Sequence, residues 1–235
     1  MYILAIDTSN QVLGVAIMKD DEVVGEMVTN IAKNHSVRLM PAIDQLMKDV
    51  QITPEQLEKI VVAEGPGSYT GVRIGMTTAK TLAWALQIPI TGASSLKVLA
   101  YQGIYFDGLI CPFFDARRGR VYTGLYHPRD ERLQLEKAER NTDMQGWLHE
   151  LAVIGKPVLF LSPDMEKHRA AIASTPGLNA FIPQAKALQT SNPSHLVLAS
   201  EENSADAVYH MTPNYLRLAE AEAKWLKAEG KKVDE

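Results

Sequence analysis

The feature that most constrains this chain is a glycine-rich stretch, residues 65–75, with the sequence GPGSYTGVRIG. It follows the apolar run at 60–63, which is typical of a buried strand, and we expect it to open directly into a helix over 71–86. Glycines on both sides of a proline predict a tight turn that a Cβ atom would obstruct. Several backbone N–H groups converge at such a helix start. This order of elements therefore predicts either an anion site or a close approach of two backbone segments.

Composition restricts the class of protein. The chain has 235 residues, of which 46% are hydrophobic and 22% are charged, as in ordinary soluble globular proteins. No apolar run reaches the ~20 residues that a membrane span needs, and the start of the chain predicts a strand rather than a signal peptide. The single Cys111 lies in an apolar stretch, so we expect an inert core thiol and a cytoplasmic protein. The net charge of -4 argues against strong, independent nucleic-acid binding.

Apolar periodicity and turn residues predict alternating strands and helices in the first half. Thr53, Pro54 and Gln56 form a capping-box pattern that predicts a short helix before the strand at residue 60. The expected elements are strands at 2–6, 12–18 and 22–28, a helix at 34–50, the helix at 71–86, a strand at 90–91 and a helix capped by Ser94.

The second half repeats this opening. The composition shifts at 103–108, and we place a boundary there, with a first lobe at 1–103 and a smaller second lobe at 104–213. Asp115 follows a new strand in the same way that Asp7 follows the first one. The expected elements are strands at 109–114, 121–126, 133–137 and 158–161, helices at 143–150 and 164–173 and after Pro193, and a last helix at about 214–230 that packs back on the first lobe.

Two turns that carry an aspartate, together with the glycine loop, are candidate phosphate sites. The first turn, Asp7-Thr8-Ser9, offers carboxylate, hydroxyl and amide groups at one spot, which suits phosphate or a hydrated metal ion. The alternative is that these side chains satisfy the amides of their own turns. The candidate binding residues are Asp7, Thr8, Ser9, Gly67, Ser68 and Asp115.

Two helices, at 34–50 and 71–86, carry apolar faces at helical spacing. Packing inside the domain is the default explanation for such faces, and a partner surface is the alternative. We predict a partner surface, which would pair with a second copy of the chain when no partner is present. Its candidate residues are Leu39, Ile43, Leu46, Met47, Val72, Met76, Ala79 and Ala83.

Signatures of common hydrolases are incomplete. His149 and Glu150 begin a zinc-protease pattern, but Val153 stands where the second histidine belongs. The segment around Ser94 lacks the second glycine of a nucleophile elbow, and the six histidines show no ligand spacing. The sequence therefore predicts no catalytic residues and no metal site.

Four motifs together resemble the bacterial TsaB family, also called YeaZ and formerly described as glycoprotease-like. They are spread from the first strand to the C-terminal region, so the resemblance covers essentially the whole chain. The motifs are ILAIDTS at 3–9, His35-Ser36, the glycine stretch at 65–75, and PNYLR at 213–217 followed by Glu220-Ala221-Glu222.

The resemblance implies an α/β fold of the actin and sugar-kinase (ASKHA, ribonuclease H-like) type. This fold is duplicated into two lobes, each with a mixed five-stranded sheet flanked by helices. It also implies a role in forming threonylcarbamoyladenosine on the adenosine beside the anticodon, in tRNAs that read codons beginning with A. In this family the protein is the scaffold and activator of the catalytic paralogue TsaD. The ATPase TsaE joins them, and tRNA is bound through the complex.

The resemblance also implies that this chain is not itself the enzyme. TsaD holds its metal with two histidines, and the matching positions here are Ser95 and Leu99, which are poor ligands. The fold clasps ATP with both aspartate turns and a later glycine pair, but no two glycines are adjacent in this chain. We therefore expect no cofactor, with ATP and metal in the partner subunits, and no membrane association. The alternative is a small-molecule, ATP-dependent kinase of the same superfamily, which Asp7 and Asp115 favour.

Overall fold

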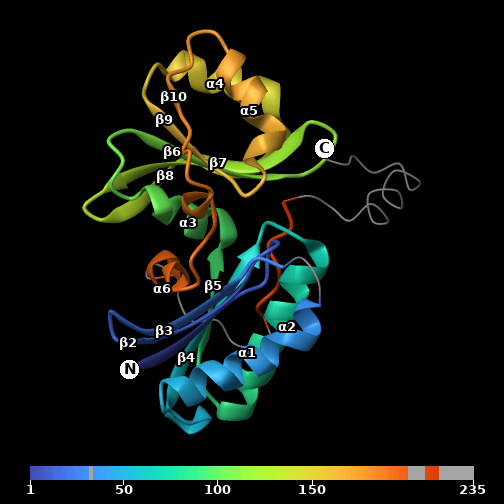
Figure 1. Ribbon diagram of the computed structural model, residues 1–235, viewed down its shortest axis with the longest axis vertical. Coiled ribbons are helices and arrows are strands. Elements are labelled where there is room, and N and C mark those ends of the chain that lie inside the picture. Colours follow the sequence, from blue (N-terminus) through green and yellow to red (C-terminus); the bar gives the residue numbers. More distant parts are fainter. Residues whose placement is uncertain (32–33, 201–209, 217–235) are drawn as a thin grey trace.

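The protein contains two five-stranded sheets. Helices lie between the two sheets and on the sides of the sheets that face away from each other (Figure 1). The computed structural model describes residues 1–31, 34–200 and 210–216. Within these ranges, no helix is long and apolar enough to cross a membrane. The helices and strands are β1 (Tyr2–Asp7), β2 (Leu13–Lys19), β3 (Glu22–Thr29), α1 (His35–Asp49), η1 (Pro54–Gln56), β4 (Leu57–Gly65), α2 (Tyr69–Leu86), β5 (Ile90–Ser94), α3 (Ser95–Ala100), η2 (Tyr101–Gly103), β6 (Leu109–Asp115), β7 (Arg120–Arg129), β8 (Arg132–Asp143), α4 (Met144–Ile154), β9 (Val158–Leu161), α5 (Met165–Ser174), β10 (Ala180–Phe181), η3 (Lys186–Gln189) and α6 (His195–Ser200).

The two sheets have the same topology. The first has the strand order β3-β2-β1-β4-β5, and the second has the order β10-β9-β6-β7-β8, which is the same arrangement read from the other edge. In each sheet three consecutive antiparallel strands are followed by strands that pair in parallel. The predicted repeat of the opening, and with it the duplicated α/β fold of two mixed five-stranded sheets, is therefore confirmed.

Each sheet has its own outer core. Helices α1 and α2 pack on one side of the first sheet, where β1, β2 and β4 supply Leu4, Ile17 and Ile60, all fully buried. Helices α4 and α5 cover the second sheet in the same way, around the fully buried Phe113 and Trp147. Both outer cores join residues on strands to residues on helices, as expected when a sheet buries a face beneath amphipathic helices.

A third core lies between the two sheets and joins them. Helices α3 and α6 contribute Leu96, Leu99 and Leu196 to it, and the two sheets contribute residues such as Ala5 and Phe114. Helix α6 contacts α3, β5, β1 and β4, although it follows the second sheet in the sequence (Figure 1). The division of the chain at residues 103 and 104 stays a prediction, and most of the expected helix at 214–230 lies outside the described residues.

Local sequence signals set several element boundaries. The predicted capping box at Thr53 is confirmed, but it starts only the single 3-10 turn η1. Strand β4 begins immediately afterwards at Leu57, because this buried residue pairs with Tyr2 and belongs to the sheet. Serine side chains cap α2 and α3, as Ser68 accepts a hydrogen bond from Gly71 N and Ser94 accepts bonds from Leu96 N and Lys97 N.

The single cysteine belongs to the core of the second sheet. Cys111 Sγ is buried and lies 3.2 Å from Trp147 Nε1, which donates to it, and 3.4 Å from Thr123 Oγ1. Burial raises the pKa of the thiol to about 11, and the two hydrogen bonds offset only part of this effect. The predicted core position of the thiol is confirmed, and its inertness stays a prediction.

We expect Cys111 to resist thiol reagents in the folded protein. With a pKa of about 11, roughly one thiol in a thousand is ionised at pH 8, and the thiolate is the reactive form. Titration with a colourimetric disulfide reagent should show no fast-reacting thiol in buffer and one in denaturant. A fast reaction in buffer would contradict the buried position.

Candidate functional site

The glycine stretch packs directly against the turn that follows β1. A Cβ atom on Gly67 would lie 2.1 Å from the carbonyl oxygen of Ser9, and one on Gly71 would lie 2.2 Å from that of Thr8. A Cβ on Gly75 would lie 2.5 Å from Thr8 Oγ1. These distances are too short for any other residue, so the three glycines allow the start of α2 to contact the turn. The close approach of two backbone segments, one of the two alternatives for this stretch, is observed.

Hydrogen bonds fix this contact. The hydroxyl of Thr8 donates to the carbonyl of Gly71 over 2.8 Å, and Ser68 N donates to the carbonyl of Ser9 over 2.6 Å. Gly71 N donates to the Ser68 side chain over 3.3 Å. Amides and hydroxyls that an anion would need are therefore bonded within the chain itself.

The carboxylate of Asp7 is sealed inside the protein, with 3% of the residue exposed. Its Oδ1 accepts bonds from Ser9 N (2.8 Å) and Ser9 Oγ (2.7 Å), and its Oδ2 accepts one from Ser191 Oγ (3.2 Å). Burial raises the pKa of Asp7, and these hydrogen bonds and the nearby His35 oppose the shift without cancelling it. Because Ser191 belongs to the segment before α6, a distant part of the chain closes this turn.

The second aspartate turn is also occupied by the protein's own side chains. Asp115 accepts a bond from Lys167 Nζ over 2.9 Å and lies 3.2 Å from His168 Nε2. Its backbone N–H donates to Asp164 over 3.1 Å. Burial alone would raise the pKa of Asp115, but the bonds from Lys167 and His168 outweigh it and hold the pKa below its ordinary value. Both Lys167 and His168 lie on α5, so this helix supplies side-chain partners to Asp115.

The structure therefore brings together only part of the predicted phosphate site. Asp7, Thr8 and Ser9 contact the glycine stretch, whereas Asp115 lies on the second sheet in its own cluster. Ser95 and Leu99, at the positions of the paralogue's metal ligands, are both buried in α3. Among the described residues, no group of three histidine, cysteine or acidic side chains is placed to hold a metal ion. The assignment of a cofactor to the predicted residues stays a prediction.

The predicted partner residues need a correction. All eight are buried within the chain, with at most 7% of any residue exposed. Seven of them, all but Val72, pack in the core that the first sheet forms with α1 and α2. A stripe of apolar residues at helical spacing is covered here by the chain's own sheet. The residues concerned are Leu39, Ile43, Leu46, Met47, Val72, Met76, Ala79 and Ala83.

The opposite sides of the same helices carry exposed apolar and aromatic residues. On α1, Val37 and Met40 are 71% and 47% exposed, and on α2, Tyr69 and Trp84 are 47% and 57% exposed. Tyr215, from the C-terminal segment, is 43% exposed and stacks on Tyr69 with ring centroids 5.5 Å apart. The sequence analysis did not select these residues. Trp84 and Val37 lie outside the apolar stripe of their helices, and this position was a signal that they are exposed. We call these five residues the outer face.

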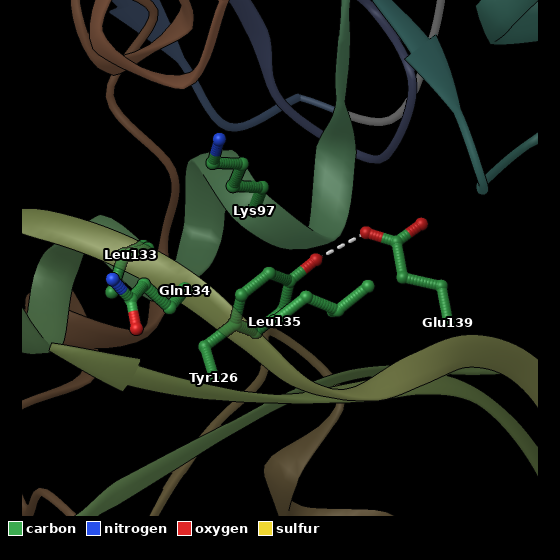
Figure 2. A pocket seen from close by; sticks show the side chains of 6 residues that line it. All are labelled: Lys97, Tyr126, Leu133, Gln134, Leu135 and Glu139. Carbon is green, nitrogen blue, oxygen red and sulfur yellow. Dashed lines mark hydrogen bonds between the residues drawn. The ribbon is translucent and has the colours of Figure 1, made fainter. Parts of the chain in front are cut away.

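The junction between the sheets holds a partly enclosed cavity of about 400 Å³ (Figure 2). Glu139 on β8 accepts hydrogen bonds there from Ser94, the cap of α3, and from the hydroxyl of Tyr126 on β7. Burial raises the pKa of Glu139, and the two hydroxyls and the charge of Lys97 oppose the shift without cancelling it. This carboxyl group therefore links the second sheet to the helix that lies between the sheets.

Replacing Gly71 with alanine should destabilise the protein by about 1–3 kcal/mol, the usual cost of overpacking a tight contact. The added Cβ would push against the carbonyl of Thr8, which is backbone and cannot rotate away. Urea unfolding followed by circular dichroism measures the change. Thr77→Ala, at an exposed position of the same helix, is the control, and equal stability of the two variants would contradict the contact.

Replacing Glu139 with glutamine should change how stability depends on pH. A raised folded pKa means that the folded protein holds the Glu139 proton more tightly than the unfolded chain. This contribution is complete below the unfolded pKa of about 4.3 and is lost as pH rises through the folded pKa. The stability of Glu139→Gln relative to the wild type should therefore rise between pH 4 and 7 in urea titrations. Glu136→Gln, on the exposed side of the same strand, is the control, and a pH-independent difference for Glu139→Gln would contradict the expectation.

Known proteins resemble this chain over half of its length or more. A family profile described as "TsaD: tRNA N6-adenosine threonylcarbamoyltransferase" matches residues 22–225. The chain is 51% identical to the tRNA threonylcarbamoyladenosine biosynthesis protein TsaB of Bacillus subtilis over 229 residues, which cover 97% of this chain and 100% of the relative. The Escherichia coli protein of the same name is 32% identical over 133 residues, 56% of this chain and 57% of the relative.

The fold is also that of a solved protein. The structure of YeaZ from Pseudomonas aeruginosa superposes with a TM-score of 0.77, at 22% identity, over 91% of this chain and 99% of that one. This likeness concerns the fold alone, while the similarity to the Bacillus subtilis protein extends over nearly the full length of both chains. The chain belongs to the TsaB family.

Proposed function

We propose that this chain is a non-catalytic subunit in the formation of threonylcarbamoyladenosine in tRNA. In this role it binds and stabilises a TsaD-type catalytic partner, for threonylcarbamoyl transfer to the adenosine beside the anticodon in tRNAs that read codons beginning with A. The observation that carries the proposal is the 51% identity, over 97% of the chain, to a protein named for this biosynthesis. The structure adds a surface suited to assembly, and the carboxylates of both aspartate turns already have partners within the described part of the chain.

The bonding of the polar groups supports the non-catalytic part of the proposal. Asp7 is buried beneath Ser191, and Asp115 is paired with Lys167. A nucleotide phosphate would have to displace bonds within the protein at each turn, and burial of Asp7 disfavours its charged form. We therefore assign ATP and metal to the partner subunits, including a TsaE-type ATPase, and tRNA binding to the complex.

The outer face supports the assembly part of the proposal. Exposed aromatic and large apolar side chains gathered on two neighbouring helices are typical of protein interfaces. A specific interface buries roughly 800 Å² per partner, and α1 and α2, with 15 and 18 residues, are long enough to supply it. Without the partner, we expect the same face to pair with a second copy of the chain. We place this role in the cytoplasm, where tRNA is modified.

The test is a substitution on the outer face with a matched control on the other lobe. Trp84→Asp should weaken binding of the TsaD-type partner by about 100-fold or more, as expected when an exposed tryptophan becomes a buried anchor at an interface. Val153→Asp makes a comparable change at a residue that is 88% exposed on α4, and it should leave binding intact. Calorimetric titration measures the affinity, and a thermal melt of each variant checks that it folds.

Reconstitution tests the function itself. With the TsaD-type partner, the ATPase, the donor and ATP present, tRNA modification should require this chain, and the chain alone should modify nothing. Modification at the full rate without the chain would contradict the proposal. Tight ATP binding by the isolated chain, with turnover on a small substrate, would instead support the kinase alternative.

A further inference from the structure

Arg73 on α2 is held in place by two tyrosines, Tyr69 one turn earlier on the same helix and Tyr215 from the C-terminal segment. Its guanidinium carbon lies 3.9 Å from the centre of the Tyr69 ring and 5.7 Å from that of Tyr215. Its Nε donates a hydrogen bond of 2.7 Å to the hydroxyl of Tyr215. The side chain is exposed, yet both ring faces and the hydrogen bond restrict its conformations.

The segment that brings Tyr215 to this place is itself anchored to the first lobe. Asn214 N donates to the carbonyl of Glu64 over 2.8 Å, and Lys80 Nζ donates to the carbonyl of Met211 over 2.9 Å. Met211 is 3% exposed and belongs to the outer core beneath α1 and α2. The arrangement of Arg73 is therefore part of the folded lobe.

The donor groups of Arg73 are only partly used. A guanidinium carries five N–H donors, and the bond to Tyr215 occupies Nε, which leaves the four N–H groups on the two Nη atoms. Within residues 1–31, 34–200 and 210–216, no carboxylate forms an ion pair with Arg73. The two Nη atoms form the fork that binds a carboxylate in a bidentate manner.

The surroundings of Arg73 favour an anionic group of modest size. Arg73 lines an open groove of about 490 Å³ beside the start of α1, and none of the described residues that line this groove is acidic. Four hydroxyl side chains add further donors for an oxygen ligand: Ser36, Thr70, Thr77 and Thr78. The groove continues the outer face, because Tyr69 belongs to both.

We propose that Arg73 is the anchor at which the TsaD-type partner inserts a carboxylate side chain, an aspartate or glutamate on a helix that packs against α1 and α2. This inference rests on the proposed function, because it names the chemistry that the partner presents to the outer face. The carboxylate binds the two Nη atoms of Arg73, and the tyrosines flank the pair and exclude water from it. Because Arg73 is already ordered, binding loses little side-chain entropy.

A carboxylate fits this place better than a nucleic-acid phosphate. Phosphate backbones are bound by tracks of several cations, and Arg73 is the only cationic residue that lines the groove among the described residues. The neighbouring Lys80 is directed to the carbonyl of Met211. The net charge of the chain, -4, also disfavours an extended RNA track.

The test compares variants of the full-length chain in calorimetric titrations with the TsaD-type partner. Arg73→Gln should weaken binding by about 10- to 100-fold, in the range of interface hot spots, and Arg73→Lys should recover only part of the loss because it keeps the charge but not the fork. Tyr215→Phe should weaken binding less than Arg73→Gln, because it removes the acceptor for Nε and keeps the ring. Arg169→Gln, which removes one exposed charge from α5, is the control and should leave affinity unchanged.

A charge reversal identifies the partner group. Arg73→Glu should abolish binding, and a scan that replaces single acidic residues of the partner with arginine should restore binding at one position. The salt dependence of wild-type affinity should be reduced in Arg73→Gln, whereas it should stay unchanged in Arg169→Gln. These results would support the inference.

Three outcomes would overturn the inference. If Arg73→Gln binds the partner with wild-type affinity, the anchor is wrong while the proposed function stands. If the wild-type chain does not bind the partner, the proposed function fails and the inference fails with it. The third outcome concerns the double variant Glu220→Gln, Glu222→Gln. If it changes the thermal stability of the free chain, and a double-mutant cycle couples this change to Arg73→Gln, the chain's own C-terminal region binds Arg73 in place of the partner.

Discussion

The contact between the glycine stretch and the turn after β1 is the constraint on which the first lobe depends. Gly67 and Gly71 place backbone against backbone, at distances where any Cβ would overlap the carbonyl oxygens of Ser9 and Thr8. This contact sets the position of α2 on the sheet. Helix α1 packs beside α2. The positions of both helices therefore depend on the absence of Cβ atoms at these glycines.

The protein's own groups close both turns that resemble phosphate sites, by a different element at each turn. At the first turn, the start of α2 and the segment before α6 close around Asp7, and its carboxylate accepts bonds from Ser9 and Ser191. At the second turn, α5 supplies Lys167 and His168 to Asp115. In both places these side chains hold separate elements of the fold together.

The arrangement of layers separates the internal junction from the surface that we assign to assembly. The second sheet reaches the first through α3 and α6, on the side of the first sheet opposite to α1 and α2 (Figure 1). Glu139, Ser94 and Tyr126 link the sheets at that junction. A partner on the outer face therefore does not compete with the second lobe, and binding there requires no opening of the central core.

The sequence alone determined the order of most strands and helices, though not the short β10, together with the capping residues and the need for glycine at 65–75. These features depend on local periodicity and on backbone sterics. It also determined the family, through motifs such as residues 3–9 and 65–75. Only the tertiary structure decided which side of α1 and α2 is exposed. An apolar stripe marks a face that must be covered, and residues such as Met76 carry no sign of whether a sheet or a partner covers it. The bond of Arg73 to Tyr215 spans 142 residues, and that of Asp7 to Ser191 spans 184, so neither has a local signal.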